Sequence, residues 1–346
     1  MNTQRYKYPE EILPSLRDVS FVCPLCHGEL VSLKNGFYCK PCAKKYRLHG
    51  GIPDFRVFPD PYLDYEQDRV RTNIILDKLE KMALPDLLEF YWSLSDVTPK
   101  SLRSKFIRSV MLGEYRAQNI LEVIGCPSDD TGGDTLIEIG SGTGNFLAVA
   151  VSRYRQVIGV DIAMRWLHLS RRRFMDLGID EPPLVCCCAE YLPFPKNSFN
   201  TTVSSSTLEF VRDPTKTLSE CARTLKKDGL LYINTVNRYS IARDPYVNLW
   251  GVGYLPRSWQ NNYVRWRRQA DYKCVNLLSL NQIRSAAAKS FSIVSVGLPN
   301  LHNSILTRLS TFERLQAKAY LTLKKLAFLH GILIWITPHW DITLRK

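Results

Sequence analysis

A glycine-rich turn constrains the fold of this 346-residue chain more than any other feature. An apolar run leads through Glu138 into Gly140-Ser141-Gly142-Thr143-Gly144, and the next apolar run ends at Asp161. Glycines allow positive φ and a close approach of the backbone to a ligand. An acid that ends the following strand is placed to bind ribose hydroxyls. The pattern predicts a strand, a turn and a helix that bind a nucleoside cofactor.

The charges around the turn distinguish two cofactors that use this geometry. A dinucleotide-binding turn follows GxGxxG and carries the pyrophosphate on the helix N-terminus, whereas here the pattern is GxGxG with Asn145 next. Glu138 is poorly placed beside a pyrophosphate but suits the ammonium group of S-adenosylmethionine (SAM). We therefore expect SAM, with NAD and a purely structural turn as the disfavoured alternatives.

The order of patterns along the chain predicts three regions. Residues 1–58 hold a cysteine module, and residues 59–133 form a helical linker or cap. Residues 134–346 alternate β-branched runs with helical stretches, which predicts an α/β sheet with helices on both faces. Strands are expected at 135–139, 157–160, 184–188, 200–204, 229–235, 291–296 and 341–345. Two inserts are expected in this region, a substrate insert at about 237–285 and a helical insert at about 303–337, within which Leu306 to Ile336 forms one long helix.

Two CxxC pairs predict a metal site in the first region. Cys23 and Cys26 are separated by 12 residues from Cys39 and Cys42, and each pair turns tightly enough to present two thiolates to one ion. Four thiolates complete a tetrahedral zinc shell and leave no open position, so the zinc is expected to be structural. The alternatives are disulfides or four unrelated thiols, and a reducing compartment disfavours the disulfides.

The cysteine module also resembles a known arrangement. The two cysteine pairs, followed by Tyr46 and by Gly51-Ile52-Pro53, are similar to the zinc ribbon of small methyltransferase-activator proteins. Residues 134–237 resemble class I SAM-dependent methyltransferases that act on small molecules, in particular the ubiquinone and menaquinone group. The segments that carry this second resemblance are the glycine turn, 189–200, 205–214 and 220–230. It implies a Rossmann-like class I methyltransferase sheet joined to a small N-terminal zinc ribbon.

The methyltransferase resemblance assigns roles to individual residues. The turn would hold the methionine end of SAM, Asp161 the ribose, and Ile162 one side of the adenine. The full cofactor set expected is Glu138, Gly140, Ser141, Gly142, Gly144, Asp161, Ile162, Cys188, Ala189, Glu190 and Ser205. This chain departs from the family in having Cys188 where an aspartate is usual and Phe210 where a histidine is frequent.

Candidates for catalysis and substrate binding are weaker. Glu209, Tyr239 and His302 are the candidate bases, although each is of a type that more often has a structural role. The insert after the fifth strand interleaves aromatic residues with arginines, which suits ring-bearing or anionic acceptors. The substrate candidates there are Arg238, Tyr239, Trp250 and Arg257, and the alternative is a solvated basic helix face.

A net charge of +13 favours anionic partners. The expected function is methyl transfer to a small anionic or glycosylated metabolite of a biosynthetic pathway. The alternatives are an RNA base methyltransferase that uses the ribbon to bind RNA, and a non-catalytic SAM-binding protein. The helical insert is expected to pack against the core, and the alternatives are that it caps the active site, lies on an anionic membrane surface or forms a dimer face. No signal peptide is recognised, which predicts a cytoplasmic protein, and the sequence does not indicate an oligomeric state.

Overall fold

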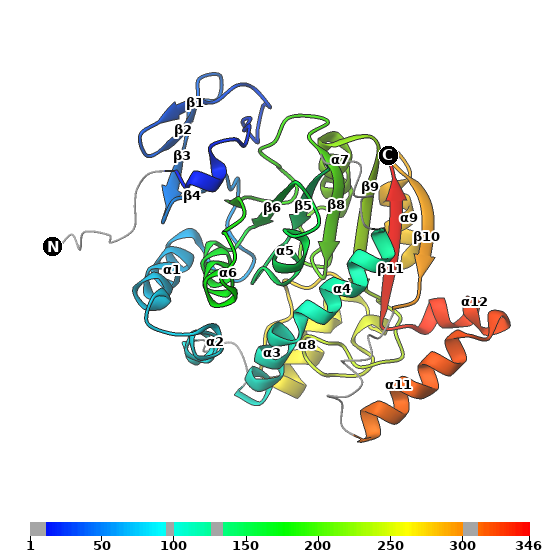
Figure 1. Ribbon diagram of the computed structural model, residues 1–346. Coiled ribbons are helices and arrows are strands. Elements are labelled where there is room, and N and C mark those ends of the chain that lie inside the picture. Colours follow the sequence, from blue (N-terminus) through cyan, green and yellow to red (C-terminus); the bar gives the residue numbers. More distant parts are fainter. Residues whose placement is uncertain (1–11, 95–99, 126–133, 300–310) are drawn as a thin grey trace.

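A seven-stranded sheet forms the centre of the computed structural model, which describes residues 12–94, 100–125, 134–299 and 311–346 (Figure 1). Its strand order is β10-β11-β9-β8-β5-β6-β7. Neighbours from β9 to β7 pair in parallel, whereas β11 is antiparallel to both β9 and β10. The strands are β5 (Thr135–Ile139), β6 (Gln156–Asp161), β7 (Leu184–Cys186), β8 (Phe199–Ser205), β9 (Leu225–Val236), β10 (Ser292–Gly297) and β11 (His339–Arg345). Each strand predicted from the sequence has a counterpart in this sheet.

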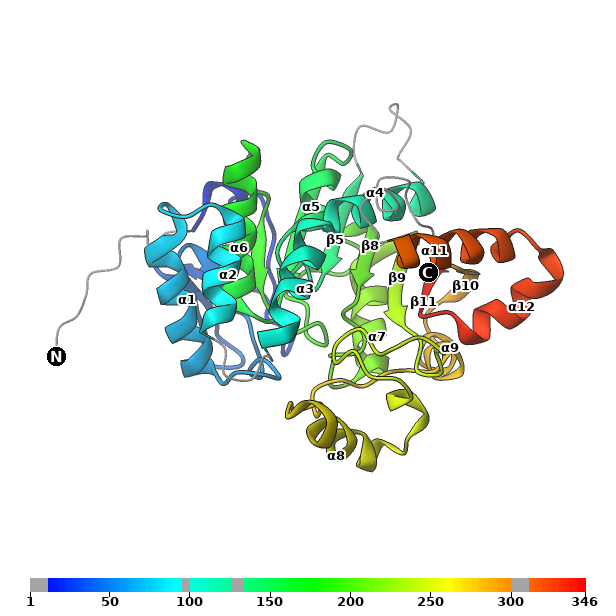
Figure 2. The same cartoon turned by 90° about the horizontal axis from the view of Figure 1, so that it is seen from below.

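Helices cover both faces of the sheet, as predicted. In the view along the strands, α4 and α5 lie on one side and α7 and α9 on the other (Figure 2). Side chains that accept from backbone amides mark two of the helix starts, Asp213 before α7 and Ser279 before α9. The helices next to the sheet are α4 (Gly113–Ile124), α5 (Asn145–Ala150), α6 (Met164–Leu177), α7 (Pro214–Thr224) and α9 (Leu280–Ala287).

The cysteine module folds as a small sheet that extends the edge of the large one. It begins with η1 (Pro14–Leu16), and its strands are β1 (Val31–Leu33), β2 (Gly36–Cys39), β3 (Lys44–His49) and β4 (Ile52–Pro53). Just after β4, Asp54 pairs in parallel with Cys186, the last residue of β7. The Phe55 amide donates to the Cys186 carbonyl at 2.7 Å. The module therefore covers the otherwise open edge at β7.

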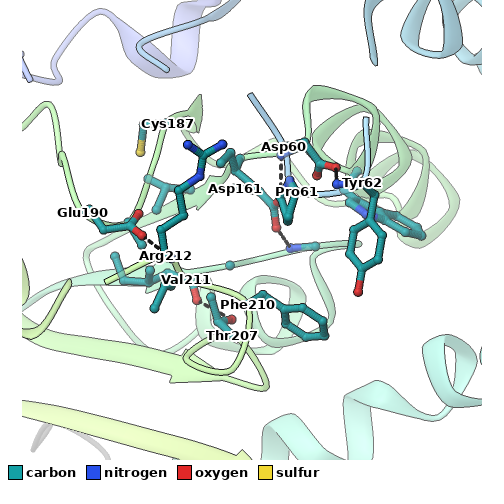
Figure 3. Close-up of a pocket in the computed structure, with 18 of the residues that line it drawn as sticks. Asp60, Pro61, Tyr62, Asp161, Cys187, Glu190, Thr207, Phe210, Val211 and Arg212 are labelled. Atoms are coloured by element: carbon teal, nitrogen blue, oxygen red, sulfur yellow. Dashed lines mark hydrogen bonds between the residues drawn. The ribbon is translucent and has the colours of Figure 1, made fainter. Parts of the chain in front are cut away.

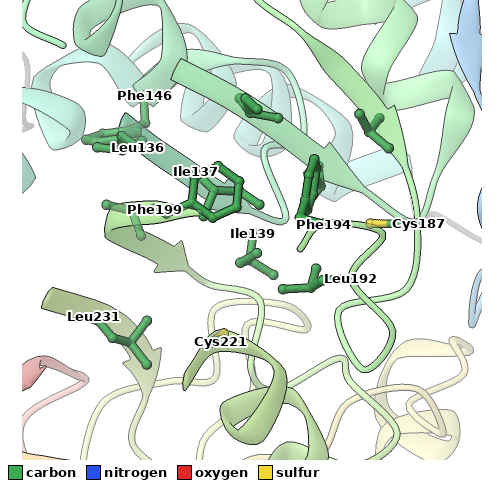
Figure 4. Packing of buried hydrophobic residues seen from close by; sticks show 14 of the residues in the cluster. Leu136, Ile137, Ile139, Phe146, Cys187, Leu192, Phe194, Phe199, Cys221 and Leu231 are labelled. Carbon is green, nitrogen blue, oxygen red and sulfur yellow. The ribbon is translucent and has the colours of Figure 1, made fainter. Parts of the chain in front are cut away.

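One hydrophobic core runs from the module into the large sheet. Phe55 lies 5.2 Å from Phe21 and 5.3 Å from Phe37 between ring centroids, and Phe21 lies 5.8 Å from Phe194. Phe194 in turn packs against the sheet interior beside Phe199 (Figure 4). Because these aromatic rings bridge the two parts, the module and the sheet are held together by packing as well as by backbone hydrogen bonds.

Helices from the middle region pack on the outside of the sheet's helical layer. α1 (Tyr65–Leu79) and α2 (Leu84–Ser93) share a separate apolar cluster with α6. A third helix, α3 (Lys100–Met111), leads into α4. The insert after β9 contains η3 (Val252–Tyr254) and α8 (Arg257–Arg268), which enclose a third small cluster.

The prediction of one long helix from Leu306 to Ile336 is wrong. The described part of that stretch contains two helices, α11 (Thr311–Lys324) and α12 (Ala327–Ile336), with Leu326 in an extended conformation between them. A straight helix over the predicted stretch would extend about 46 Å. Here Lys324 donates to the Leu298 carbonyl at 2.9 Å, and Trp340 donates to the Ile334 carbonyl at 2.7 Å. Figure 1 shows the two helices as a hairpin that projects from the body of the molecule and returns to it at β11.

Candidate functional site

The turn after β5 presents backbone, rather than side chains, to an open space. Gly140 and Gly142 have φ of 75° and 50°, which L side chains rarely adopt. A Cβ on Gly140 would collide with Thr207, whereas one on Gly142 would meet no atom within 4 Å. The Gly140 and Ser141 amides donate to the Val160 carbonyl at 2.8 and 2.9 Å, which fixes the turn against β6.

Two adjoining cavities lie at this turn, where ligands bind in open α/β sheets. The first has a volume of about 330 Å³ and lies between the ends of β6 and β8 and the segment that follows β4 (Figure 3). The second, of about 250 Å³, extends from the turn toward α4. Both are lined by Gly140, Gly142, Trp166 and Ser206, so they form one continuous site.

Asp161, the last residue of β6, presents a fixed carboxylate to the first cavity. Its Oδ2 accepts from the Gly142 amide at 2.9 Å and its Oδ1 from the Ala163 amide at 2.8 Å. Burial raises the pKa of Asp161 to about 6. Each carboxylate oxygen keeps a further lone pair, so the geometry suits the two hydroxyls of a ribose, and Ile162 continues the same wall.

Glu138 is the most unusual side chain of the second cavity. It is 5% exposed, and its Oε2 has no hydrogen-bond partner in the part of the chain that the structure describes. Burial, followed by the charge of Asp161, raises the pKa of Glu138 well above its ordinary value. A buried acceptor without a partner is costly. The ammonium group of SAM is a ligand that would satisfy it, so the residues present fit this cofactor.

Several residues of the site carry no sequence signal that links them to the glycine turn. Arg116 on α4 lines the second cavity, where its guanidinium also donates to the Ser109 hydroxyl at 3.2 Å. Trp166 on α6 touches both cavities. The segment after β4 supplies a wall of the first cavity, formed by Phe58, Asp60, Pro61 and Tyr62. Only the tertiary fold brings these three elements to the turn.

A buried ion network holds that wall against α6. Asp68 is fully buried and accepts from Arg56 at 2.7 Å and from Arg165 at 2.6 Å. Arg56 also donates to the Ile162 carbonyl at 3.2 Å, and Arg165 pairs with Asp60 at 3.3 Å. The segment leaving the cysteine module is thereby tied to the end of β6 through charge-assisted hydrogen bonds.

The structure brings most of the expected cofactor residues to these cavities. Those that line them are Glu138, Gly140, Ser141, Gly142, Asp161, Ile162, Ala189, Glu190 and Ser205. Gly144 instead begins α5, where a Cβ would come within 2.8 Å of Phe174 and Ser170. Its role in the structure is close helix packing.

The structure places Cys188 beside the cavities, outside the residues that line them. Its neighbour Cys187 lines the first cavity, whereas the Cys188 Sγ accepts from the Val57 amide at 3.4 Å. The Cys188 thiol also donates to the Phe58 carbonyl at 3.5 Å. Cys188 is therefore turned toward the segment that follows the cysteine module.

The four cysteines of the module converge as predicted. Their Sγ atoms all lie within 4.8 Å of one another, with 3.8 Å between Cys23 and Cys42 and 3.6 Å between Cys26 and Cys39. These separations are far longer than the roughly 2.05 Å of a disulfide. A tetrahedral zinc with Zn–S bonds of about 2.3 Å separates its sulfurs by about 3.8 Å, so the four side chains fit a zinc ion.

The candidate bases are placed differently from one another. Glu209 is fully buried, and its carboxylate accepts from the Tyr246 hydroxyl and, at 2.9 Å, from the Thr235 hydroxyl. With both oxygens engaged, it braces the insert after β9. Tyr239 is 39% exposed on the surface of that insert. His302 lies outside the described residues.

Of the four substrate candidates, Arg257 lies in a groove. An open groove of about 690 Å³ is lined by Arg257, Lys273 and Asn276, and it shares Pro61 and the stretch 210–212 with the first cavity. Arg238 donates from its Nε to the Gly253 carbonyl at 3.0 Å and so holds the insert together. Tyr239 and Trp250 lie on the outer surface.

Comparisons with known proteins agree with this geometry. Residues 137–233 match the family described as "Methyltransferase domain". Together with the strand order and the curated methyltransferase relatives, the match shows that this part of the chain is a class I SAM-dependent methyltransferase domain.

Two curated relatives are 33% identical over part of their length. The chain matches the biotin biosynthesis bifunctional protein BioHC of Cellvibrio japonicus over 38% of its own residues and 24% of that protein. It matches the malonyl-[acyl-carrier protein] O-methyltransferase of Laribacter hongkongensis over 29% of its own residues and 37% of that enzyme. Among solved structures, a SAM-dependent methyltransferase from Mesorhizobium loti aligns with a TM-score of 0.46 at 16% identity, over 68% of this chain and 98% of the other. The chain therefore matches well under half of the length of the BioHC protein and of the Laribacter enzyme.

Proposed function

We propose that this protein transfers a methyl group from SAM to a small acceptor that carries an anionic group. The observation that carries the proposal is Glu138, a buried carboxylate with an unpartnered oxygen that lines a cavity beside the glycine turn. When bound, the cofactor supplies a methyl group activated by its sulfonium. Glu138 would hold its ammonium group, Arg116 its carboxylate and Asp161 its ribose.

The remaining residues of the first cavity exclude water and orient the nucleoside. Ile162 and Ala189 line one side and Phe58 belongs to the wall that follows β4. Arg212 lies over the Phe58 ring at 3.9 Å from the centroid and donates to the Pro59 carbonyl at 3.3 Å. This cation–π contact closes the rim of the cavity.

The open groove beside the first cavity supports an anionic acceptor. Arg212, Arg257 and Lys273 line it, and no aspartate or glutamate of the described residues does. Positioning near the methyl group supplies much of the rate in such a transfer. An acceptor that is already ionised needs no proton removed, which agrees with a Glu209 carboxylate engaged by two hydroxyls. A glycosylated acceptor stays the alternative, because the insert is rich in aromatic residues.

The relatives support oxygen as the accepting atom. One is named as an O-methyltransferase of malonyl-[acyl-carrier protein], and others as ubiquinone biosynthesis O-methyltransferases. We also propose that Cys23, Cys26, Cys39 and Cys42 bind a structural zinc ion, which leaves no open position for chemistry.

Two measurements test the proposal in sequence. Calorimetric titration of the zinc-replete protein with SAM should show binding, and Asp161→Ala should abolish it. Methyl transfer should then be measured from labelled SAM to carboxylate and phosphate acceptors and to their neutral esters. We expect transfer to the ionised forms, with a raised KM but an unchanged SAM affinity in Arg257→Gln. Preference for the neutral esters, or no SAM binding by the wild type, would contradict the proposal.

A further inference from the structure

An aromatic surface surrounds the end of the molecule at which the cofactor cavities open. It consists of exposed apolar side chains from the insert after β9 and from α12, namely Ile241, Trp250, Tyr254, Trp266, Phe328, Ile332 and Trp335. Trp266 is 74% exposed and Phe328 is 78% exposed. Large apolar side chains gathered this way mark an interaction site rather than ordinary surface. We call this set the aromatic face.

The two parts of the aromatic face adjoin each other. The Trp250 and Tyr254 rings stack with 6.2 Å between centroids, and the Trp250 indole donates to the Ile241 carbonyl at 3.2 Å. The Ile241 amide donates to the Ile336 carbonyl at 3.3 Å, which joins the insert to the end of α12. Phe328, Ile332 and Trp335 follow one another at helical spacing and so form one stripe of α12.

The aromatic face lies on the same side of the sheet as the cavities. α12 ends just before β11, and His339 at the start of β11 pairs with Val236, the last residue of β9. α8 belongs to the insert that leaves the same end of β9. Figure 1 shows α8 and α11 in the lower part of the molecule and α12 at its right, and Figure 2 shows α8 apart from the α11–α12 pair.

The charge of this region complements an anionic surface. Residues 237–340 contain fourteen lysines and arginines but three aspartates and glutamates, and therefore carry eleven of the chain's thirteen net positive charges. Arg267 lies beside Trp266, with its guanidinium 5.2 Å from the ring centroid. Arg265 is exposed on α8, where it pairs with Asp271 at 3.3 Å, and Lys318 and Lys325 are exposed on α11 and between α11 and α12. One of the three acids, Asp244, is buried and bonded to Tyr272.

We propose that the aromatic face docks on the surface of a membrane that contains anionic lipids. Tryptophan and tyrosine favour the headgroup level of a bilayer, and basic residues near the surface are attracted by its negative potential. None of the described helices combines the length and apolar character that a bilayer crossing needs. α12 instead exposes Phe328, Ile332 and Trp335, side chains that can enter the boundary between headgroups and acyl chains from the surface. The cofactor cavities would then open toward the lipid headgroups.

Vesicle co-sedimentation of the full chain tests this docking independently of any methyl transfer. We expect binding to vesicles of equal parts phosphatidylglycerol and phosphatidylcholine, weak binding to phosphatidylcholine alone, and a blue shift of tryptophan emission on binding. Trp266→Ser combined with Phe328→Ser should abolish binding. Arg267→Gln and Lys325→Gln should each weaken it by about fivefold, as expected for one cation at an anionic surface.

Matched variants elsewhere control for loss of folding and for nonspecific attraction. Met175→Ser with Leu177→Ser removes exposed apolar side chains at the end of α6, and Arg153→Gln removes a cation at the opposite end of the sheet, just before β6. These variants should bind vesicles like the wild type, and all variants should keep the wild-type thermal unfolding curve. The proposal is overturned if the control variants lose binding equally, or if neither vesicle binds. It is likewise overturned if single-stranded RNA binds with a steep salt dependence while vesicles do not, or if the aromatic variants only dissociate a dimer.

Discussion

Replacing Glu138 with glutamine tests two effects of its buried carboxylate separately, the loss of folding stability that it causes and the affinity for SAM that we assign to it. The change keeps the shape of the side chain and removes the negative charge that we assign to the ammonium group of SAM. Removing one partner of a buried charge pair costs about 2–5 kcal/mol. We therefore expect the dissociation constant for SAM to rise by roughly 30-fold to several thousand-fold.

In the free protein the same substitution should stabilise the fold. Burial raises the pKa of Glu138 well above its ordinary value, so the folded protein binds this proton more tightly than the unfolded chain. Stability then falls as the pH rises from the unfolded pKa, near about 4.3, toward the folded one. Glutamine has no such proton to lose. We expect Glu138→Gln to exceed the wild type by about 1–3 kcal/mol at about pH 8, with the difference vanishing near pH 4.

The assay combines calorimetric titration with SAM and denaturant unfolding of the free protein across this pH range. Glu181→Gln is the matched control, because Glu181 is a partly buried carboxylate with one unpartnered oxygen that pairs with Arg171 at 2.8 Å, and it lines neither cavity. It should keep its affinity for SAM. The reasoning is refuted if Glu138→Gln binds SAM like the wild type, or if it loses affinity and stability together.

Four other perturbations have defined outcomes. Asp68→Asn should lower the free energy of unfolding by about 3–5 kcal/mol in urea titrations, because it leaves Arg56 and Arg165 underpaired in a buried network. Arg116→Gln should weaken SAM binding in calorimetry but leave the affinity for adenosine unchanged, since Arg116 lines the methionine end of the site. Chelation of the proposed zinc should reduce SAM affinity together with the circular-dichroism signal of the ribbon, and added zinc should restore both. Burial lowers the pKa of His339 to about 4, so between about pH 6.5 and about pH 4 only the unfolded chain takes up this proton. Stability should fall by about 1.4 kcal/mol per pH unit as the solution is acidified, and His339→Asn should remove that slope.

Local spacing explains which features were predictable from the sequence. The glycine turn, Asp161 and the cysteine pairs act through neighbours a few residues apart, and the sheet strands are marked by runs of buried β-branched residues. The position of Glu138 at the cavity followed from its place just before the turn. The structure has these features at the expected positions, because their geometry depends mainly on residues close in the sequence.

Long-range packing explains what was missed. The residues around Arg116 give no sign that α4 lies next to the turn. The wall formed by residues 58–62 lies at the cavity because the chain just before it, at Asp54, pairs with Cys186. The break at Leu326 was also missed, because the residues on either side of it include no proline or glycine that would predict the end of a helix. Cys187 lines the cavity and Cys188 does not, which depends on how the chain turns after the end of β7.

The pairing of Asp54 with the edge of β7 limits how far the chain can be shortened from its N-terminal side. A boundary drawn from sequence similarity alone would begin a fragment at residue 137, where the match to the methyltransferase family starts. Such a fragment would lack the wall supplied by Phe58 and Tyr62, so its cofactor cavity would be open on one side. It would also expose the unpaired edge of β7, which is the kind of edge through which sheets aggregate. The smallest fragment that keeps this wall and this pairing therefore begins no later than Asp54.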